Sequence, residues 1–310
     1  MTLRELGFPA MGTGVRLLGS LGAPLEAARA LVEDLEARLT RFDPGSELCR
    51  LNDDPRETVP ASAELRAAVT AALDGAAATG GLADPTLLGA LVEAGYARSV
   101  TGRPRADLHE ALASAPAPRP AAPARDPAWR LVRVGPDSIT RPPGVRLDLG
   151  GSAKGHAADL AAAVLAPYGP CAVDLGGDLR VSGSHEVQVM HPLTGRPVAT
   201  LTLHGDAVAT SGIDRRLWWD TAARPAHHLL DPSTNRPAWT GILSATAKAP
   251  TAALAEALAK AAVLAGRPEI LETHGGVLIA YDGTVDETVG RDGAASRREV
   301  VAADRGAVVA

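Results

Sequence analysis

The order in which strand-like and helix-like segments follow one another is the feature of this sequence that most constrains its fold. Short apolar runs with β-strand preference, such as Phe8–Leu18 and Cys171–Leu175, are mixed with longer runs whose apolar residues recur at helical spacing, such as Leu25–Leu39 and Thr251–Ala265. Several strand segments follow one another directly, without the strict alternation of strand and helix that a doubly wound parallel sheet requires. The sequence therefore predicts an α+β fold with mixed sheets and flanking helices.

The remaining segments continue this pattern along the chain. Further helices are expected over Ala61–Thr79, Leu87–Tyr96 and His156–Leu165. Further strands are expected over Leu131–Val134, Ser138–Arg141, Val145–Leu149, Leu179–Ser182, Glu186–Met190, Ala199–Leu203, Ala207–Thr210, Leu243–Ala247 and Gly276–Tyr281.

Two segments depart from this pattern. Residues 103–127 are rich in proline and alanine, and proline lacks the backbone donor that helices and strands need, so we expect a surface insertion without regular structure. The polar, alanine-rich residues 287–310 are expected to form a flexible C-terminal tail. Composition does not change across the insertion, which favours one domain over residues 1–286; a boundary between two lobes at the insertion is the alternative.

Composition and charge exclude several classes of protein. A hydrophobic fraction of 46% with 22% charged residues is typical of a globular chain with a real core. No run approaches the roughly 20 apolar residues that a membrane-spanning helix needs, and the N-terminus lacks a signal pattern, so a cytoplasmic location without membrane insertion is expected. The net charge is −5 and the Lys and Arg residues are scattered, which argues against nucleic-acid binding. Cys49 and Cys171 form no metal-ligand spacing and are expected to be reduced.

A glycine-rich loop over Asp148–Gly155 joins an expected strand to an expected helix. Its glycines allow a ligand to approach the backbone, the helix presents free N–H groups, and Lys154 adds a positive charge. These features suit a phosphate, although the spacing matches neither the Walker loop nor GxGxxG. The alternative is a simple glycine turn with a solvated lysine.

Two further motifs predict a tight turn and a residue suited to proton transfer. Asp174–Asp178 repeats the Asp-Leu-Gly-Gly pattern between two expected strands, which predicts a tight hairpin with glycines at positive φ. His227 and His228 precede an Asp-Pro turn, and imidazole is the side chain best matched to proton transfer near neutral pH. Neighbouring residues of a strand point to opposite faces, so we expect one histidine to be buried and neutral and the other exposed.

These motifs occur in a characteristic order with others. They are Met11-Gly12-Thr13, Arg41–Leu48 with Leu51-Asn52, Gly81–Thr86, Asp148–Gly155 with Asp159, Asp174–Asp178, Ala209–Gly212 with Arg216, and His228–Pro232. Together they resemble the motifs of the ApbE family, the FAD:protein FMN transferases, over nearly the whole chain. Ala83 departs from that pattern, because it stands where the family usually has an aromatic residue.

The resemblance implies an α+β, T-fold-like architecture that binds FAD and, with Mg²⁺, transfers FMN to a threonine hydroxyl of a partner protein, releasing AMP. In this reading Lys154 neutralises the diphosphate, Asp148 accepts from ribose or adenine donors, Phe42 offers a ring face, and His228 is the base for the incoming threonine. By motif position, the flavin nucleotide site is implied at Met11, Phe42, Ala83, Asp84, Pro85, Asp148 and Lys154, with His228 and Leu229 beside it.

The implied metal site departs from the family pattern. The resemblance places the metal on the carbonyl of Gly151 and on an Asp and a Thr one helical turn apart, where this chain has Glu256 and Lys260. Glutamate can still chelate, but lysine has three donors and no acceptor, whereas Mg²⁺ needs oxygen ligands. The alternative is that Glu256 and Lys260 form an (i, i+4) surface pair opposite the apolar stripe of their helix.

Three hypotheses about function follow from this sequence. The first is an enzyme that transfers FMN from FAD to a protein threonine, and a weaker relative of it is a metal-dependent FAD pyrophosphatase. The other class is an FAD-binding protein that keeps the ApbE fold but has lost or reduced transferase activity. His228 and the Asp148–Gly155 loop favour the transferase, and Lys260 favours the binding protein.

Overall fold

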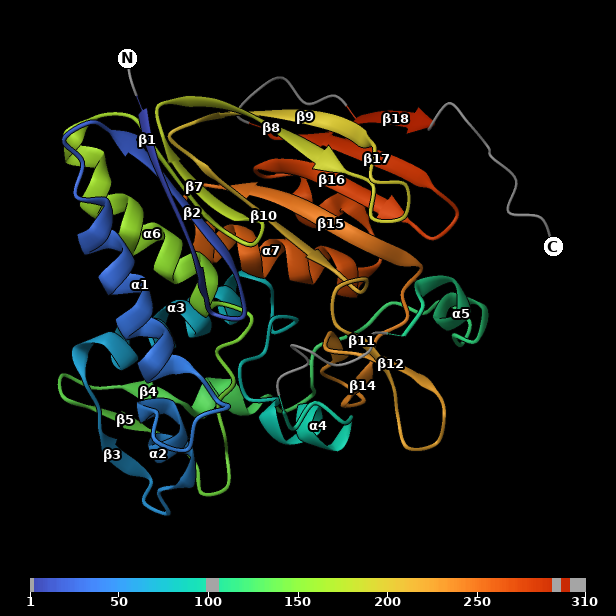
Figure 1. Ribbon diagram of the computed structural model, residues 1–310. Helices are drawn as coiled ribbons and strands as arrows, with labels where there is room; N and C mark the ends of the chain where they lie inside the picture. The colour runs from blue at the N-terminus through green and yellow to red at the C-terminus, as the bar shows by residue number, and fades with distance from the viewer. Residues whose placement is uncertain (1–2, 99–105, 292–296, 302–310) are drawn as a thin grey trace.

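A nine-stranded antiparallel sheet is the largest sheet of the described residues (Figure 1). This computed structural model describes residues 3–98, 106–291 and 297–301. Along the sheet the strands follow the order β1 (Leu3–Ala10), β2 (Thr13–Ser20), β6 (Cys171–Leu175), β7 (Asp178–Ser182), β10 (Ala207–Gly212), β15 (Ile242–Ala249), β16 (Gly275–Ala280), β17 (Thr284–Val289) and β18 (Arg297–Val301).

Helices cover one face of this sheet. Helix α7 packs across β10 and β15, while α6 packs on β6 and β7 and contacts both α1 and α7 (Figure 1). The helices are α1 (Leu25–Leu39), α2 (Glu47–Asp53), α3 (Ala63–Ala78), α4 (Leu88–Glu93), α5 (Leu108–Ala113), α6 (Ala153–Leu165) and α7 (Ala252–Ala265), with 3₁₀ turns at Ala128–Leu131, Ala166–Tyr168 and Pro268–Leu271.

Smaller sheets complete the fold. One has three strands, β3 (Thr58–Pro60), β5 (Ser138–Thr140) and β4 (Arg133–Val134), and three are two-stranded: β8 (Ser184–Met190) with β9 (Pro197–His204), β11 (Leu217–Trp219) with β12 (Pro225–His227), and β13 (Leu230–Asp231) with β14 (Arg236–Pro237). The expected mixture of helices and sheets is therefore present, and all paired strands of the described residues run antiparallel.

The segment Val145–Leu149 is not the strand that its apolar sequence predicts. The side-chain amide of Asn52 satisfies Leu147 in place of a neighbouring strand: Leu147 N donates to Asn52 Oδ1 at 2.7 Å, and Asn52 Nδ2 donates to Leu147 O at 2.8 Å. A buried side-chain amide can thus supply both hydrogen bonds of a missing strand neighbour. Helix α6 also begins at Ala153, within the glycine loop, three residues earlier than expected.

The proline-rich insertion is more ordered than its composition suggests. Helix α5 forms within it, because Asp107 caps the helix by accepting a hydrogen bond from Glu110 N. The extended part that follows is tied to the body of the protein by backbone hydrogen bonds, including Arg119 N to Trp239 O and Ala121 N to Leu264 O. Residues 103–105 of the insertion lie outside the described part of the chain.

The expected tail begins inside the sheet. Strand β17 continues to Val289, and β18 pairs with it antiparallel as the edge strand, so residues 287–289 and 297–301 belong to the sheet rather than to a free segment. The Val and Thr residues of β17 favour a strand, and Val285 and Thr288 are its buried residues, a signal that the polar composition obscured. Residues 292–296 and 302–310 lie outside the described residues.

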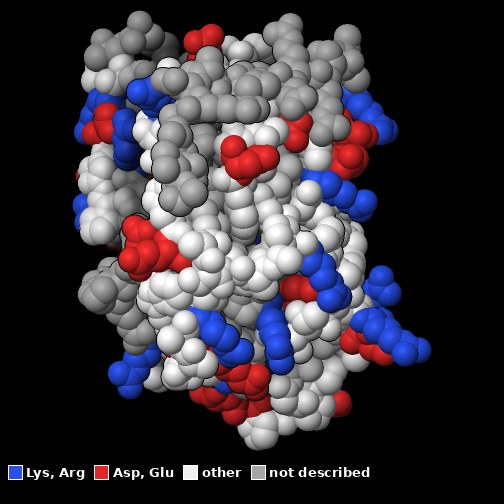
Figure 2. Space-filling model, turned by 90° about the vertical axis from the view of Figure 1, so that its right-hand side faces the viewer, with Lys and Arg blue, Asp and Glu red and all other residues white. Residues whose placement is uncertain are grey.

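Charges of both signs are mixed on one face of the molecule. On the face drawn in Figure 2, basic and acidic side chains are interspersed with uncharged ones, without one continuous basic area. In the described part of the chain, no helix combines the length and apolar character needed to cross a bilayer.

The crossing of α6 and α7 depends on Gly155. A Cβ atom on Gly155 would lie 2.5 Å from the carbonyl oxygen of Ala252 and 2.7 Å from the amide of Ala253, both backbone atoms that cannot rotate away. We expect Gly155→Ala to lower the free energy of unfolding by about 1–3 kcal/mol or more, as overpacking does, measured by urea denaturation. The matched control is Gly89→Ala in α4, where a Cβ meets nothing within 4 Å. Alanine there should stabilise by about 0.5–1 kcal/mol, so equal midpoints for the two variants would contradict this account.

Candidate active site

A cavity of about 890 Å³ lies where the helical face of the sheet meets the loops around α4. This size is typical of a small-molecule site. Its wall combines the β1–β2 turn, the end of α1 with the loop after it, the segment before α4, the glycine loop at the start of α6, the end of β10 and one face of α7.

The residues implied for the nucleotide site come together in this cavity. They originate in segments far apart along the chain, and the fold is what brings them to one wall. Lining residues include Met11, Phe42, Ala83, Asp84, Pro85, Asp148, Gly151, Lys154, His228, Leu229, Glu256 and Lys260.

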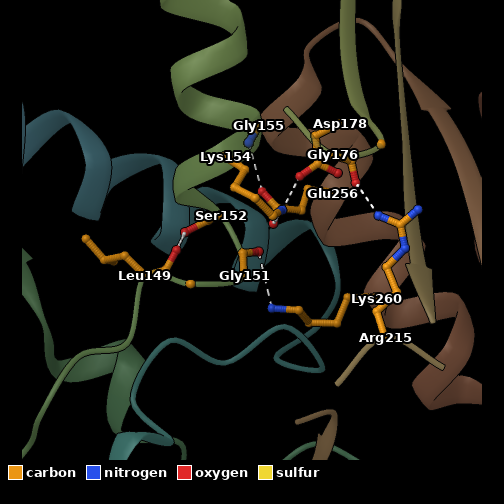
Figure 3. A network of polar contacts seen from close by, with 12 residues as sticks. Leu149, Gly151, Ser152, Lys154, Gly155, Gly176, Asp178, Arg215, Glu256 and Lys260 are labelled. Carbon is orange, nitrogen blue, oxygen red and sulfur yellow. Dashed lines mark hydrogen bonds and ion pairs between the residues drawn. The ribbon is translucent and has the colours of Figure 1, made fainter. Parts of the chain in front are cut away.

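Lys154 is held by two buried carboxylates rather than by solvent (Figure 3). Its Nζ forms ion pairs with Glu256 Oε1, at 2.7 Å, and with Asp178 Oδ2. Burial disfavours the charge of Lys154, but Asp178 and Glu256 outweigh this and raise the pKa of Lys154 to about 12. Burial, together with the negative charge of Glu256, raises the pKa of Asp178 to about 7. The alternative of a solvated lysine is therefore wrong, and its charge is already largely offset within the protein.

Glu256 and Lys260 do not form the surface pair considered as an alternative. Glu256 is only 3% exposed, and its second oxygen, Oε2, accepts a hydrogen bond from Gly155 N at 2.9 Å. Small alanine side chains on several sides of α7 let most of the helix be buried, so the apolar stripe did not mark a single inward face. Lys260 lies one turn further along α7 and donates through Nζ to Gly151 O at 3.2 Å (Figure 3).

The residues present do not fit a Mg²⁺ site at Gly151. The Gly151 carbonyl accepts from the Lys260 ammonium, and both oxygens of Glu256 are engaged by Lys154 and Gly155. A Cβ on Gly151 would lie 1.5 Å from Lys260 Nζ, which shows how closely the lysine end covers this position. Across the described ranges, no group of three or more His, Cys, Asp and Glu side chains is arranged to hold a metal ion. Mg²⁺ requires an octahedral shell of oxygen ligands, and the Lys260 ammonium cannot be one of them because it only donates hydrogen bonds.

The two histidines differ in their surroundings. His227 is fully buried at the end of β12, its ring edge-on to Trp239 at 4.8 Å, and its Nδ1 accepts from Leu229 N at 3.2 Å. Burial lowers the pKa of His227 to about 3. This is the buried, neutral histidine that was expected.

His228 lines the cavity and is half-buried rather than exposed. Burial, and then the nearby charge of Arg216, hold the pKa of His228 well below its ordinary value. Its Nδ1 is buried and has no hydrogen-bond partner within the described part of the chain. A neutral imidazole with a free nitrogen can accept a proton at neutral pH.

Sequence reasoning overlooked an aromatic group around Arg41. The Arg41 guanidinium carbon lies 4.2 Å from the ring centre of Phe42 and 4.4 Å from that of Tyr96, which in turn stacks on Trp218 at 5.3 Å. Arg41 Nε also pairs with Asp148 Oδ1 at 3.2 Å, and its Nη2 is buried without a partner among the described residues. Arg41 lay within a recognised motif, but only the fold shows that Tyr96 lies beside it and that Trp218 stacks on Tyr96.

Asp84 has a local role in addition to lining the cavity. Its Oδ1 accepts from the backbone N of Thr86 at 2.7 Å and from the Thr86 hydroxyl at 2.5 Å, which fixes the turn before α4. Burial raises the pKa of Asp84 above its ordinary value. Asp148 is likewise engaged, because it pairs with Arg41. The binding roles of both carboxylates therefore stay predictions.

Comparison with known proteins relates this chain to one family of proteins. Residues 11–277 match the profile of the ApbE family. A FAD:protein FMN transferase of Rhodobacter capsulatus is 35% identical over 135 residues, which is 41% of this chain but only 25% of that protein. The FAD:protein FMN transferase of Haemophilus influenzae is 26% identical over 272 residues, covering 80% of this chain and 74% of that one.

Solved structures agree with these sequence matches. The crystal structure of the ApbE protein of Thermotoga maritima superposes with a TM-score of 0.75 at 26% identity, covering 92% of this chain and 97% of that one. The flavin transferase ApbE of Vibrio cholerae superposes with a TM-score of 0.71 at 20% identity, covering 94% and 97%, a likeness of fold. The expected α+β fold is confirmed, and this chain belongs to the ApbE family.

Proposed function

We propose that this protein binds FAD in the cavity and transfers FMN to a threonine hydroxyl of a partner protein, with release of AMP. One observation carries the proposal: residues of the family motifs surround a single cavity that has a neutral histidine, His228, on its wall. The names of the sequence relatives support the same activity.

The proposed reaction follows from the chemistry of the wall. The threonine oxygen attacks the phosphorus of the FMN half of FAD, and a new O–P bond forms as the P–O bond to AMP breaks. His228 takes the hydroxyl proton, and AMP leaves with the bonding electrons as a phosphate monoester. The start of α6 and the lysine Lys260 lie where they can face the diphosphate, and the aromatic group around Arg41 can hold a flat ring.

A second candidate function is FAD binding with little or no transfer. The observation that favours it is the Lys260 ammonium on the Gly151 carbonyl, because one fixed charge stabilises a phosphoryl-transfer transition state less than a dication does. The fold and the nucleotide cavity would then serve binding alone. We keep cytoplasmic location and a partner protein carrying the acceptor threonine as parts of the proposal.

Mass spectrometry separates these functions. When the protein is incubated with FAD and a threonine-bearing acceptor protein, we expect the intact mass of the acceptor to increase by one FMN phosphoester, with AMP released in equal amount. The control is the same acceptor with its threonine replaced by alanine, which should stay unmodified. Free FMN and AMP without an adduct would indicate a pyrophosphatase instead, and bound, unchanged FAD would indicate a binding protein.

A further inference from the structure

Lys260 places a positive charge in the cavity wall, next to the Gly151 carbonyl. It lies on α7 one turn after Glu256, and its Nζ reaches across to Gly151 O at 3.2 Å, at the start of the loop that leads into α6 (Figure 3). An ammonium carries the same sign of charge as a metal ion but can only donate hydrogen bonds. This position is therefore already filled by a cation that belongs to the chain.

The charge of Lys260 differs from those of Lys154 and Arg41 in the group that it contacts. Lys154 contacts two carboxylates, Asp178 and Glu256, and Arg41 contacts Asp148. Lys260 instead donates to a neutral carbonyl oxygen, as Arg215 does to Gly176 O, so no carboxylate contacts it directly. Burial lowers the pKa of Lys260, and Glu256 and Asp148 oppose this from a greater distance. Of these three cations, Lys260 is the one best placed to meet an anionic ligand in the cavity.

We infer that Lys260 serves as a fixed cation for the diphosphate of FAD, in place of a divalent metal ion. The inference rests on the proposed function, because it takes FAD as the ligand of the cavity. An ammonium on a helix is covalently attached and needs no metal from solution, so FAD binding by this protein is independent of Mg²⁺. It brings one positive charge rather than two and cannot join oxygens of protein and substrate, so transfer is slower than with a dication.

FAD titrations with and without metal test this inference. Binding is followed by flavin fluorescence or calorimetry in EDTA and again in Mg²⁺, for the wild type, Lys260→Met and Lys260→Arg. Methionine keeps the length of the side chain and removes its charge, whereas arginine keeps the charge. The matched control is Lys248→Met, because Lys248 lies on β15, donates to Thr202 O and does not line the cavity.

We expect the wild type to bind FAD with the same affinity in EDTA and in Mg²⁺. Lys260→Met should bind about 10- to 100-fold more weakly in EDTA, the usual effect of losing a hydrogen bond between charged groups. Lys260→Arg should retain most of the affinity, and Lys248→Met should bind as the wild type does. Thermal melting of each variant shows that it is folded.

Two outcomes would overturn the inference. One is a wild-type affinity for FAD that rises tenfold or more on adding Mg²⁺, and the other is a folded Lys260→Met variant with unchanged affinity in EDTA. Failure of the proposed function looks different. If the wild type binds FAD as expected but never modifies an acceptor, the role of Lys260 in binding stands and the transfer does not; if FAD does not bind at all, both are wrong.

Discussion

Replacing His228 with asparagine should lower FMN transfer to the acceptor by about 10²- to 10⁴-fold, the usual effect of removing a general base. His228 lines the cavity, and the low pKa that burial and Arg216 impose keeps its ring neutral at pH 7, so it is ready to take the threonine proton. Asparagine has a similar shape but cannot accept a proton. Single-turnover transfer of FMN to the acceptor protein measures the loss, and an FAD titration should show nearly unchanged affinity.

The neighbouring histidine provides the matched control. His227 does not line the cavity, so His227→Phe should retain most of the transfer activity at pH 8. If the His228 variant transfers FMN as fast as the wild type, His228 is not the base. If its affinity for FAD falls in proportion to its rate, His228 acts in binding and not in proton transfer.

Acid should destabilise this protein through His227, beginning at a pH where most carboxylates are still ionised. Burial lowers the pKa of His227 to about 3 in the folded chain, against about 6.5 in an unfolded one. As the pH falls below 6.5, the unfolded chain takes up a proton that the native chain does not, so the loss of stability begins there and continues towards pH 3. Each pH unit in this window costs about 1.4 kcal/mol for this one group, or about 2 kcal/mol by pH 5.

Urea denaturation of the wild type and His227→Phe at pH 7 and pH 5 measures this term. Phenylalanine keeps a ring beside Trp239 and cannot titrate. Its larger size and the lost Leu229 N contact lower stability equally at both pH values, so the variant should lose about 2 kcal/mol less than the wild type between them. His109→Gln is the control, since His109 is exposed on α5 and should follow the wild-type curve. Equal losses in the wild type and His227→Phe would mean that His227 becomes protonated without unfolding.

Turns and helices formed by neighbouring residues were predictable because their conformation depends on the local sequence. The Asp174–Asp178 turn is the tight β6–β7 hairpin that its glycines predict, with Gly176 and Gly177 at φ values of +68° and +105°. The helix after the glycine loop was likewise evident from its alanine-rich sequence. The start of the tail was misjudged because its polar composition was given more weight than the β-preferring Val and Thr residues of β17, which pairs with β16.

Side-chain partners across the cavity could not be predicted in this way. Nothing near Lys154 in the sequence indicates that it meets Asp178 and Glu256, because the latter is brought to it by the crossing of α6 and α7. Tyr96 joins Phe42 beside Arg41, and Trp218 stacks on Tyr96, for the same reason. These contacts depend on how distant elements pack, which a local pattern does not encode.

The sequence by itself determined the α+β class, the loops that surround the cavity and the family, because turn glycines, helix periodicity and motif order are properties of neighbouring residues. Only the tertiary structure decided the state of the charged side chains: Glu256 is buried with Lys154, and Lys260 covers the Gly151 carbonyl. The physical reason is that the charge and accessibility of a group depend on burial and on its nearest partners, and α7 acquires both only when its alanine-lined faces pack against the sheet and α6.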